Sequence, residues 1–233
     1  MIRMINVGKV YRRGLVETHA LSGFNLTVKA GEFVAVMGPS GSGKTTFLNV
    51  AGLLDAFDDG DYLVGGTSVR GLSDDALSRL RNLRIGFIFQ SYQLIADLDV
   101  RDNIDVPLRY RGLTRADRRA RIDRAIARVG LTARSRHFPA ELSGGQQQRV
   151  AIARAIAGDP EIILADEPTG NLDSLMARQI MDLLEETRAA GATIVMVTHD
   201  PSLAARADRT IHVLDGRVID PRSAARSGPR APR

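Results

Sequence analysis

The 233-residue sequence contains no cysteine and only three lysines. Without cysteine the chain cannot build a disulfide framework, so it does not need an oxidising compartment. No apolar run reaches the roughly 18 residues that a membrane-spanning helix requires, and residues 1–14 lack the apolar centre of a signal peptide. We therefore expect a cytoplasmic protein, and any membrane crossing would have to come from a partner chain.

An excess of acidic residues is also missing, since the formal net charge is +5. Most of this charge lies in residues 221–233, which hold four arginines and no acid: Arg222, Arg226, Arg230 and Arg233. The rest of the chain is nearly neutral, which argues against nucleic acid as a partner. Because serine, alanine, glycine and proline separate these arginines, we expect a disordered, solvated tail. The scarcity of lysine, with arginine in its place, is read as compositional bias.

The remaining residues, 44% hydrophobic over the whole chain, suffice for one substantial core. Apolar runs predict strands that alternate with helices, which indicates an α/β fold with a largely parallel sheet. The strands are expected near Phe33–Met37, Ile85–Phe89, Ile162–Asp166, Thr193–Val197 and Thr210–Leu214. The amino-terminal stretch resembles an antiparallel β arm. From Gln90 onward the character becomes helical, with one apolar face along Ala116–Val129.

A glycine-rich stretch, Gly38-Pro39-Ser40-Gly41-Ser42-Gly43-Lys44-Thr45, follows the first of these strands. It matches the pattern G-x-x-x-x-G-K-[ST] in the strand–loop–helix context that a phosphate-binding loop needs. Glycines let successive N–H groups turn toward phosphate oxygens, and the helix expected from Lys44 directs its positive end at them. Lys44 would neutralise the β- and γ-phosphates, and Thr45 would ligate Mg²⁺. An ordinary glycine-rich turn is the alternative.

Two carboxylates, Asp166 and Glu167, end the run from Ile162. Neighbours on a strand point to opposite faces, so Asp166 could reach a magnesium ion through water while Glu167 polarises an attacking water. These roles suit phosphoryl transfer, in which positioning and charge stabilisation supply most of the catalysis. The alternative is an acidic pair that ends the strand before the turn at Pro168–Asn171.

Leu142-Ser143-Gly144-Gly145-Gln146, together with the two motifs above, resembles the signature of ABC (ATP-binding cassette) ATPases. The resemblance runs from about Val7 to Val218. It is strongest to the branch that powers lipoprotein release and macrolide export (LolD/MacB-like). It implies a P-loop ABC ATPase core over residues 1–220, with an inserted α-helical subdomain at about 91–157. The implied cofactors are ATP and Mg²⁺.

The resemblance also assigns roles to single residues. Tyr11 matches the aromatic that stacks on adenine, Gln90 the glutamine that senses metal and γ-phosphate, and His199 the histidine that contacts the γ-phosphate. An ordinary strand aromatic, a surface glutamine and a non-catalytic histidine are the respective alternatives. His199 follows a strand carboxyl end, where open α/β sheets bind ligands. The implied metal contacts are Thr45, Gln90 and Asp166, and the implied catalytic side chains are Lys44, Glu167 and His199.

The signature and Asp173 are expected to act across an interface between two copies. Ser143 with the N–H groups of Gly144 and Gly145 would face the γ-phosphate held by the partner, although Ser-Gly-Gly is also simply a good helix start. Asp173 would touch the opposing subunit, with a turn residue as the alternative. The full set of implied nucleotide contacts is Tyr11, Gly38, Ser40, Gly41, Ser42, Gly43, Lys44, Thr45, Thr46, Gln90, Ser143, Gly144, Gly145, Gln146 and Asp173.

The implied function is that of an ATP-hydrolysing subunit that dimerises on ATP and drives an integral-membrane permease, docked through Ser91–Asn103 at the inner face of the membrane. A similar ATPase in a complex that transmits force and transports nothing is an alternative. A third class, ABC proteins acting on DNA or ribosomes, normally needs a second cassette or a long insertion, and neither is present. Asp58-Asp59-Gly60-Asp61 departs from the branch, and we expect a turn there because of Gly60.

Overall fold

The computed structural model describes residues 1–14 and 16–219, which form two compact units. Unit 1 holds Met1–Lys29, Phe33–Gly71 and the described residues from Val197 onward, and unit 2 holds Ala30–Glu32 and Leu72–Met196. The basic tail at 221–233 lies outside the described residues, so its expected disorder stays a prediction. Among the described residues, none of the helices has the length and apolar character to cross a membrane.

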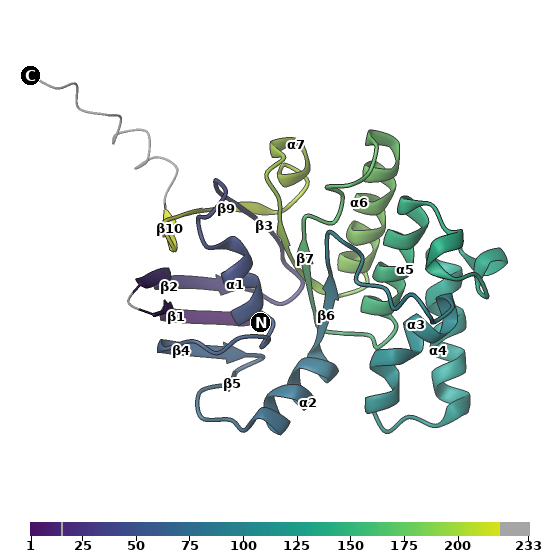
Figure 1. Cartoon of the computed structure of the whole chain (residues 1–233), viewed down its shortest axis with the longest axis horizontal. Coiled ribbons are helices and arrows are strands. Elements are labelled where there is room, and N and C mark those ends of the chain that lie inside the picture. Colours follow the sequence, from purple (N-terminus) through teal and green to yellow (C-terminus); the bar gives the residue numbers. More distant parts are fainter. Residues whose placement is uncertain (15, 220–233) are drawn as a thin grey trace, which may run out of the picture. The chain divides into compact units, whose positions relative to one another are not determined.

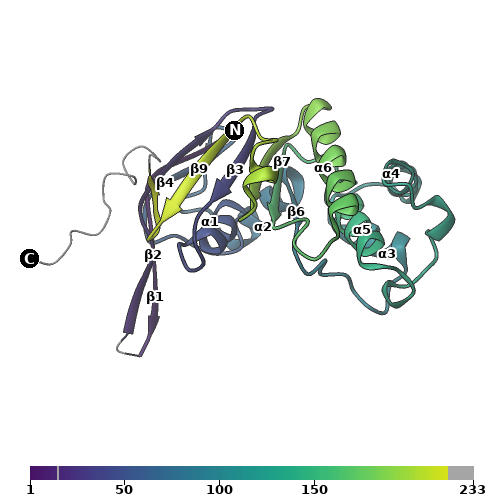
Figure 2. The same ribbon diagram turned by 90° about the horizontal axis from the view of Figure 1, so that it is seen from above.

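The amino-terminal part of unit 1 is the expected antiparallel arm. Its sheet has the order β2 (Val16–Val28), β1 (Ile2–Arg13), β4 (Asp59–Val64) and β5 (Thr67–Ser68), with every neighbouring pair antiparallel. Ile2, Met4 and Val7 of β1 are fully or almost fully buried. The far end of the β1–β2 hairpin extends beyond the rest of unit 1 (Figure 2).

The second part of unit 1 carries the strand that precedes the glycine-rich loop. β3 (Phe33–Met37) runs parallel to β9 (Arg209–Leu214), which is antiparallel to β10 (Arg217–Ile219). Helix α1 (Lys44–Ala51) follows the loop, and a short helix, α7 (Pro201–Ala204), precedes β9 in the chain (Figure 1). Phe47 of α1 stacks on Phe24 of β2 with ring centroids 5.0 Å apart, which anchors α1 in the apolar core.

Unit 2 combines strands with most of the helices. β6 (Ile85–Ile88) is parallel to β7 (Ile162–Asp166), whose other neighbour is β8 (Thr193–Val197). The helices are α2 (Asp74–Arg84), α3 (Val100–Asp105), α4 (Arg115–Arg128), α5 (Gly144–Ile156) and α6 (Ser174–Ala189), with 3₁₀ turns η1 (Val106–Tyr110), η2 (Thr132–Arg134) and η3 (Pro139–Glu141). Ile122, Ala125 and Ile126 form the predicted buried face of α4.

The expected turn at Asp58–Asp61 is wrong, because β4 begins at Asp59 and pairs with β1. Gly60 has φ +86°, and a Cβ atom there would collide with the main-chain oxygens of Ile5 and Asn6. The glycine therefore permits a close strand-to-strand approach. Local composition favours a turn, but pairing with β1 decides the conformation.

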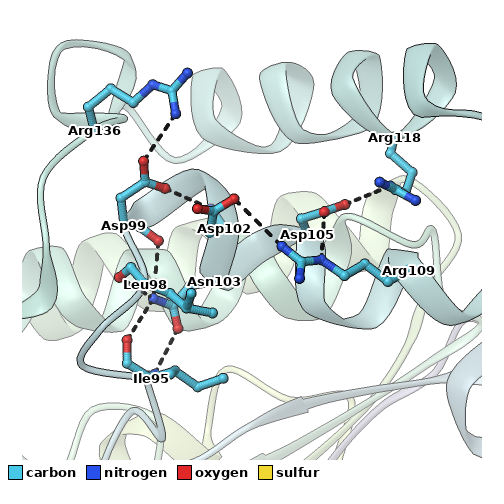
Figure 3. A network of polar contacts seen from close by, with 9 residues as sticks. All are labelled: Ile95, Leu98, Asp99, Asp102, Asn103, Asp105, Arg109, Arg118 and Arg136. Atoms are coloured by element: carbon cyan, nitrogen blue, oxygen red, sulfur yellow. Dashed lines mark hydrogen bonds and ion pairs between the residues drawn. The ribbon is translucent and has the colours of Figure 1, made fainter.

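Asn103 is the centre of a polar network that shapes the segment before α3 (Figure 3). Its side chain is fully buried, and its amide nitrogen donates to the carbonyls of Ile95 (3.1 Å), Leu98 (2.8 Å) and Asp99 (3.1 Å). Its amide oxygen accepts from the Ile95 N–H at 2.8 Å. Because one side chain satisfies four main-chain groups, it fixes the path of residues 95–99.

We expect Asn103→Leu to lower the free energy of unfolding by about 2–4 kcal/mol, since it leaves these main-chain groups without their partner in a buried site. Urea unfolding measures the change. Asn25→Leu is the matched comparison, because Asn25 is exposed on β2 and also bonds to main-chain groups, those of Asn6 and Gly23. Water can replace these exposed hydrogen bonds, so Asn25→Leu should cost less than Asn103→Leu. Equal stability of Asn103→Leu and the parent would contradict the role given to Asn103.

Candidate nucleotide site

The loop from Gly38 to Gly43 has the backbone that phosphate binding requires. Gly41 and Gly43 have φ values of +77° and +101°, which residues with side chains rarely adopt. A Cβ atom on Gly38 would collide with the main-chain oxygen of Val213. Helix α1 begins at Lys44 directly after the loop, so its free N–H groups and positive dipole end are directed toward the loop. The geometry matches an anion-binding turn.

Polar side chains of this loop provide further donors. The Lys44 ammonium donates to the carbonyls of Gly38 and Pro39, both at 2.7 Å, so it is held over the loop. The Ser42 hydroxyl is buried and has no hydrogen-bond partner within the part of the chain that the structure describes. Ser40 and Thr45 are exposed beside them. A cationic amine, hydroxyls and free N–H groups form the donor set that a magnesium-bound triphosphate needs, so the residues fit the group.

Two further predicted residues lie in unit 1. The Thr198 N–H donates to the carbonyl of Val36 at 3.2 Å, so the segment that carries His199 joins β3 two residues before the loop begins. His199 is exposed there. Tyr11 lies near the far end of β1, opposite Thr18, and its side chain is 40% exposed. Burial and then a hydrogen bond to Asp55 raise the pKa of Tyr11, while the Thr46 hydroxyl acts in the opposite direction.

In unit 2 the two predicted carboxylates end β7 as expected. Ile162, Ile163, Leu164 and Ala165 are buried, and Asp166 is the last strand residue. Glu167 has φ +41°, a region that is unfavourable for residues other than glycine. The turn after it is held by Gly170 N–H to the Glu167 carbonyl at 3.0 Å and by the buried Gln148 amide to the Pro168 carbonyl at 2.7 Å. These hydrogen bonds of the following turn hold the main chain of Glu167 in its unfavourable conformation.

The predicted sensor glutamine lies close to this turn. A Cβ atom on Gly170 would be 2.8 Å from the Gln90 amide nitrogen and 3.3 Å from Oε2 of Glu167, so the two side chains converge on Gly170. The Asn171 side chain donates to the Gln90 carbonyl at 3.0 Å. The absence of a side chain at Gly170 thus leaves room for the amide and the carboxylate to approach each other.

The signature forms the start of α5. Ser143 caps the helix by accepting from the Gln146 N–H at 3.3 Å, and the Gln146 side chain accepts from the Ser143 N–H at 3.0 Å. A Cβ atom on Gly144 would lie 2.8 Å from the Tyr92 hydroxyl, and one on Gly145 would lie 2.7 Å from Met176. The atoms in the way are the ends of two flexible side chains, which can turn aside, so packing within one chain does not by itself demand glycine at these positions. The Ser143 cap also fits the simpler alternative, an ordinary helix start.

Asp173 also has a local structural role. It is exposed, and its carboxylate accepts from the N–H groups of Leu175 (3.0 Å) and Met176 (2.9 Å) at the start of α6. This is ordinary helix capping. The contact with a second copy stays a prediction.

Sequence reasoning missed the residues that hold the motifs in place. Arg154 of α5 donates to the carbonyls of Tyr92 (2.7 Å) and Gln93 (2.5 Å), which both have positive φ values. Burial lowers the pKa of Arg154. Lys9 and Asp55 similarly contact each other and Tyr11. The one sequence feature that could have indicated the role of Arg154 is its position within an otherwise apolar stretch of α5.

Comparisons with known proteins identify the family of the chain. Residues 21–170 match the family model described as ABC transporter. The chain is 47% identical over 219 residues to the macrolide export ATP-binding/permease protein MacB of Hyphomonas neptunium, covering 94% of this chain and 34% of that protein. It thus spans about a third of the length of the MacB relatives.

Other relatives match along their whole length. The uncharacterized ABC transporter ATP-binding protein YknY of Bacillus subtilis is 44% identical, with 97% of this chain and 99% of that protein covered. The dimeric post-hydrolysis structure of the ATP-binding cassette MJ0796 with ADP and Pi has a TM-score of 0.88 and 43% identity, covering 94% and 97% of the two chains. The fold is the expected α/β fold of a P-loop ABC ATPase core, and the chain belongs to the ABC transporter family.

Proposed function

We propose that the chain binds MgATP and hydrolyses it as the ATPase subunit of an ABC membrane complex. The observation that carries this proposal is the loop from Gly38 to Gly43, whose positive-φ glycines, buried Ser42 hydroxyl and overlying Lys44 form an anion cradle at the start of α1. Thr45, Gln90 and Asp166 would hold Mg²⁺. Bound there, the ion would neutralise charge on the phosphates.

Lys44, Glu167 and His199 carry the catalytic roles in this proposal. Lys44 exchanges its two loop carbonyls for phosphate oxygens, Glu167 orients and deprotonates the attacking water, and His199 contacts the γ-phosphate. The base stacks on Tyr11, with Thr46 beside it. The convergence of Gln90 and Glu167 on Gly170 supports a shared water and metal environment.

A second copy of the chain completes the site in this proposal. The structures of MJ0796 are described as dimeric. The N–H groups at the start of α5, with Ser143, would then meet the γ-phosphate of the partner's ATP, and Asp173 would contact the partner. ATP binding drives closure, since only the closed pair makes both sets of contacts with it.

We assign the membrane partner to the surface around residues 91–96. A pocket of about 490 Å³ in unit 2 is lined by Ser91, Tyr92, Gln93, Leu94, Ala96, Pro139, Ala140 and Gln147. It directly follows Gln90 in the chain, so a permease segment bound there would sense the state of the ATP site. The protein would act at the inner face of the membrane through this partner. Residues 1–220 would form the ATPase domain, with a helical subdomain at about 91–157.

ATPase measurements on the purified chain test the proposal. If two copies share each ATP, the rate per chain should rise with protein concentration while the dimer is sparsely populated, because the active species needs two chains. A rate per chain that stays constant over a hundredfold range, down to concentrations where the chain is monomeric, would contradict the two-copy site. No MgATP-dependent phosphate release at any concentration would contradict the proposed hydrolysis.

A further inference from the structure

The hydroxyl of Tyr11 belongs to a three-residue network in unit 1. It donates to Oδ2 of Asp55 at 2.6 Å, and the Lys9 ammonium donates to Oδ1 of the same carboxylate at 2.8 Å. The Lys9 and Asp55 side chains are only 11% and 28% exposed. Each oxygen of the Asp55 carboxylate thus has its own donor. The two donors, Lys9 and Tyr11, are two positions apart on β1 and bind the same carboxylate.

The pKa shifts of Asp55 and Tyr11 both favour the hydrogen bond between them. Burial would raise the pKa of Asp55, but the hydrogen bonds from Lys9 and Tyr11 outweigh it and lower that pKa. The carboxylate is therefore charged at neutral pH. Burial and the hydrogen bond to Asp55 raise the pKa of Tyr11, so the phenol keeps its proton and remains a donor. Charge-assisted hydrogen bonds of this kind are stronger than neutral ones.

Asp55 lies four residues after the end of α1 (Lys44–Ala51), the helix that follows the phosphate loop. The N–H groups of Leu54 and Asp55 donate to the carbonyl of Asn49 in α1, at 2.8 Å and 3.3 Å. Lys44 is the first residue of the same helix. Through Asp55, the network therefore ties the aromatic ring on β1 to the segment directly after α1, the helix whose start would bind phosphate.

Lys9 also limits how a base could approach the ring. Its ammonium lies 5.1 Å from the centroid of the Tyr11 ring, within the range of a cation–π contact. A flat base can stack only on ring surface that Lys9 does not cover, and the side chain of Tyr11 retains 40% of its exposure. The network thus fixes the position of the ring and leaves part of it available.

From this geometry we propose that Asp55, together with Lys9, is a positioning residue for nucleotide recognition. It holds the Tyr11 ring in place relative to the phosphate loop, so that the base and the phosphates of one nucleotide are bound without reordering the ring. The gain in affinity comes from this preorganisation. The inference rests on the proposed function, in which Tyr11 stacks on adenine.

Calorimetric titration with two ligands tests this role. MgATP has a base, whereas magnesium tripolyphosphate presents only phosphates. We expect Asp55→Ala and Tyr11→Phe each to weaken MgATP binding by about threefold to tenfold, the effect of one lost hydrogen bond. The loss of affinity in the double variant should be clearly smaller than the sum of the two single losses, because both changes remove the hydrogen bond between Tyr11 and Asp55. Tripolyphosphate affinity should stay within about twofold for all of them.

Asp61→Ala is the matched control, since Asp61 lies in the neighbouring strand β4 and pairs with Arg70 at 3.6 Å, not with Tyr11. It should leave both affinities unchanged. Tyr11→Phe removes a single oxygen and keeps the ring, so it tests the network even if Asp55→Ala does not fold. Thermal unfolding of each variant shows whether its fold is retained.

Three results would overturn the inference. Unchanged MgATP affinity in Asp55→Ala and Tyr11→Phe, with weaker binding in Tyr11→Ala, would mean that the ring acts without being positioned. Equal weakening for MgATP and tripolyphosphate would mean that Asp55 only supports the phosphate loop. Unchanged MgATP affinity in Tyr11→Ala would mean that Tyr11 does not stack on adenine. In that case the MgATP affinity of Lys44→Ala shows separately whether the phosphate site of the proposed function exists.

Discussion

Glu167→Gln should reduce the ATP turnover number by about 10²–10⁴-fold, the usual contribution of a positioned general base. The substitution keeps the size of the side chain and its ability to form hydrogen bonds, but it removes the carboxylate oxygen that would accept a proton from water. The backbone at φ +41° and the turn through Gly170 remain intact. We therefore expect MgATP affinity within about threefold of the parent. Single-turnover phosphate release and calorimetric titration measure the two quantities.

The control for this variant is Glu161→Gln, which makes the same chemical change just before β7, at the end opposite Glu167. Glu161 is partly exposed and pairs with Arg84 at 3.2 Å, and its substitution should leave turnover within about twofold. Parent-like turnover in Glu167→Gln would show that another group activates the water. A parallel loss in both variants would point to a general effect on β7.

Lys44→Ala should weaken MgATP binding by at least about tenfold and up to about 150-fold. These factors correspond to ~1.5–3 kcal/mol for a hydrogen bond to a charged partner. The ammonium is held by two carbonyls of the loop, so it is already placed where phosphate oxygens would replace them. Tripolyphosphate binding should fall by a similar factor, because Lys44 acts on phosphates and not on the base. Titration calorimetry at fixed ionic strength measures both.

Lys29→Ala is the matched control, because it removes the same charge from an exposed position in the same unit. Its affinity for MgATP should stay within about twofold. Equal affinities of Lys44→Ala and the parent would refute the phosphate role of the loop. Equal losses in both lysine variants would mean that net charge, and not the geometry of the loop, attracts the nucleotide.

The parts of the fold that follow from contiguous sequence patterns could be predicted closely. The strands β3, β7 and β8 match their apolar runs to the residue, because each strand is buried almost throughout. β9 begins one residue earlier than its apolar run, at Arg209, since that residue pairs with Val34 of β3. Main-chain pairing of this kind does not depend on the polarity of the side chain.

What could not be predicted depends on contacts between distant residues. The prediction of a turn at Asp58–Asp61 is wrong because β1 pairs with this segment. The motifs of the candidate site are short and local, so the sequence showed them directly. Their supports are not local: Asp55 contacts Tyr11 across 44 positions, and Arg154 contacts Gln93 across 61. No spacing rule links such residues before the fold is known.

We propose that ATP is bound between two copies, with Ser143 of one copy on the nucleotide of the other. Sedimentation velocity of Glu167→Gln, with and without MgATP, tests it most directly. We predict the mass of two chains with MgATP and of one chain without it. Adding Ser143→Arg should keep the chain a monomer that still binds MgATP. A Glu167→Gln chain that stays a monomer when saturated with MgATP, or a double variant that dimerises equally well, would contradict the claim.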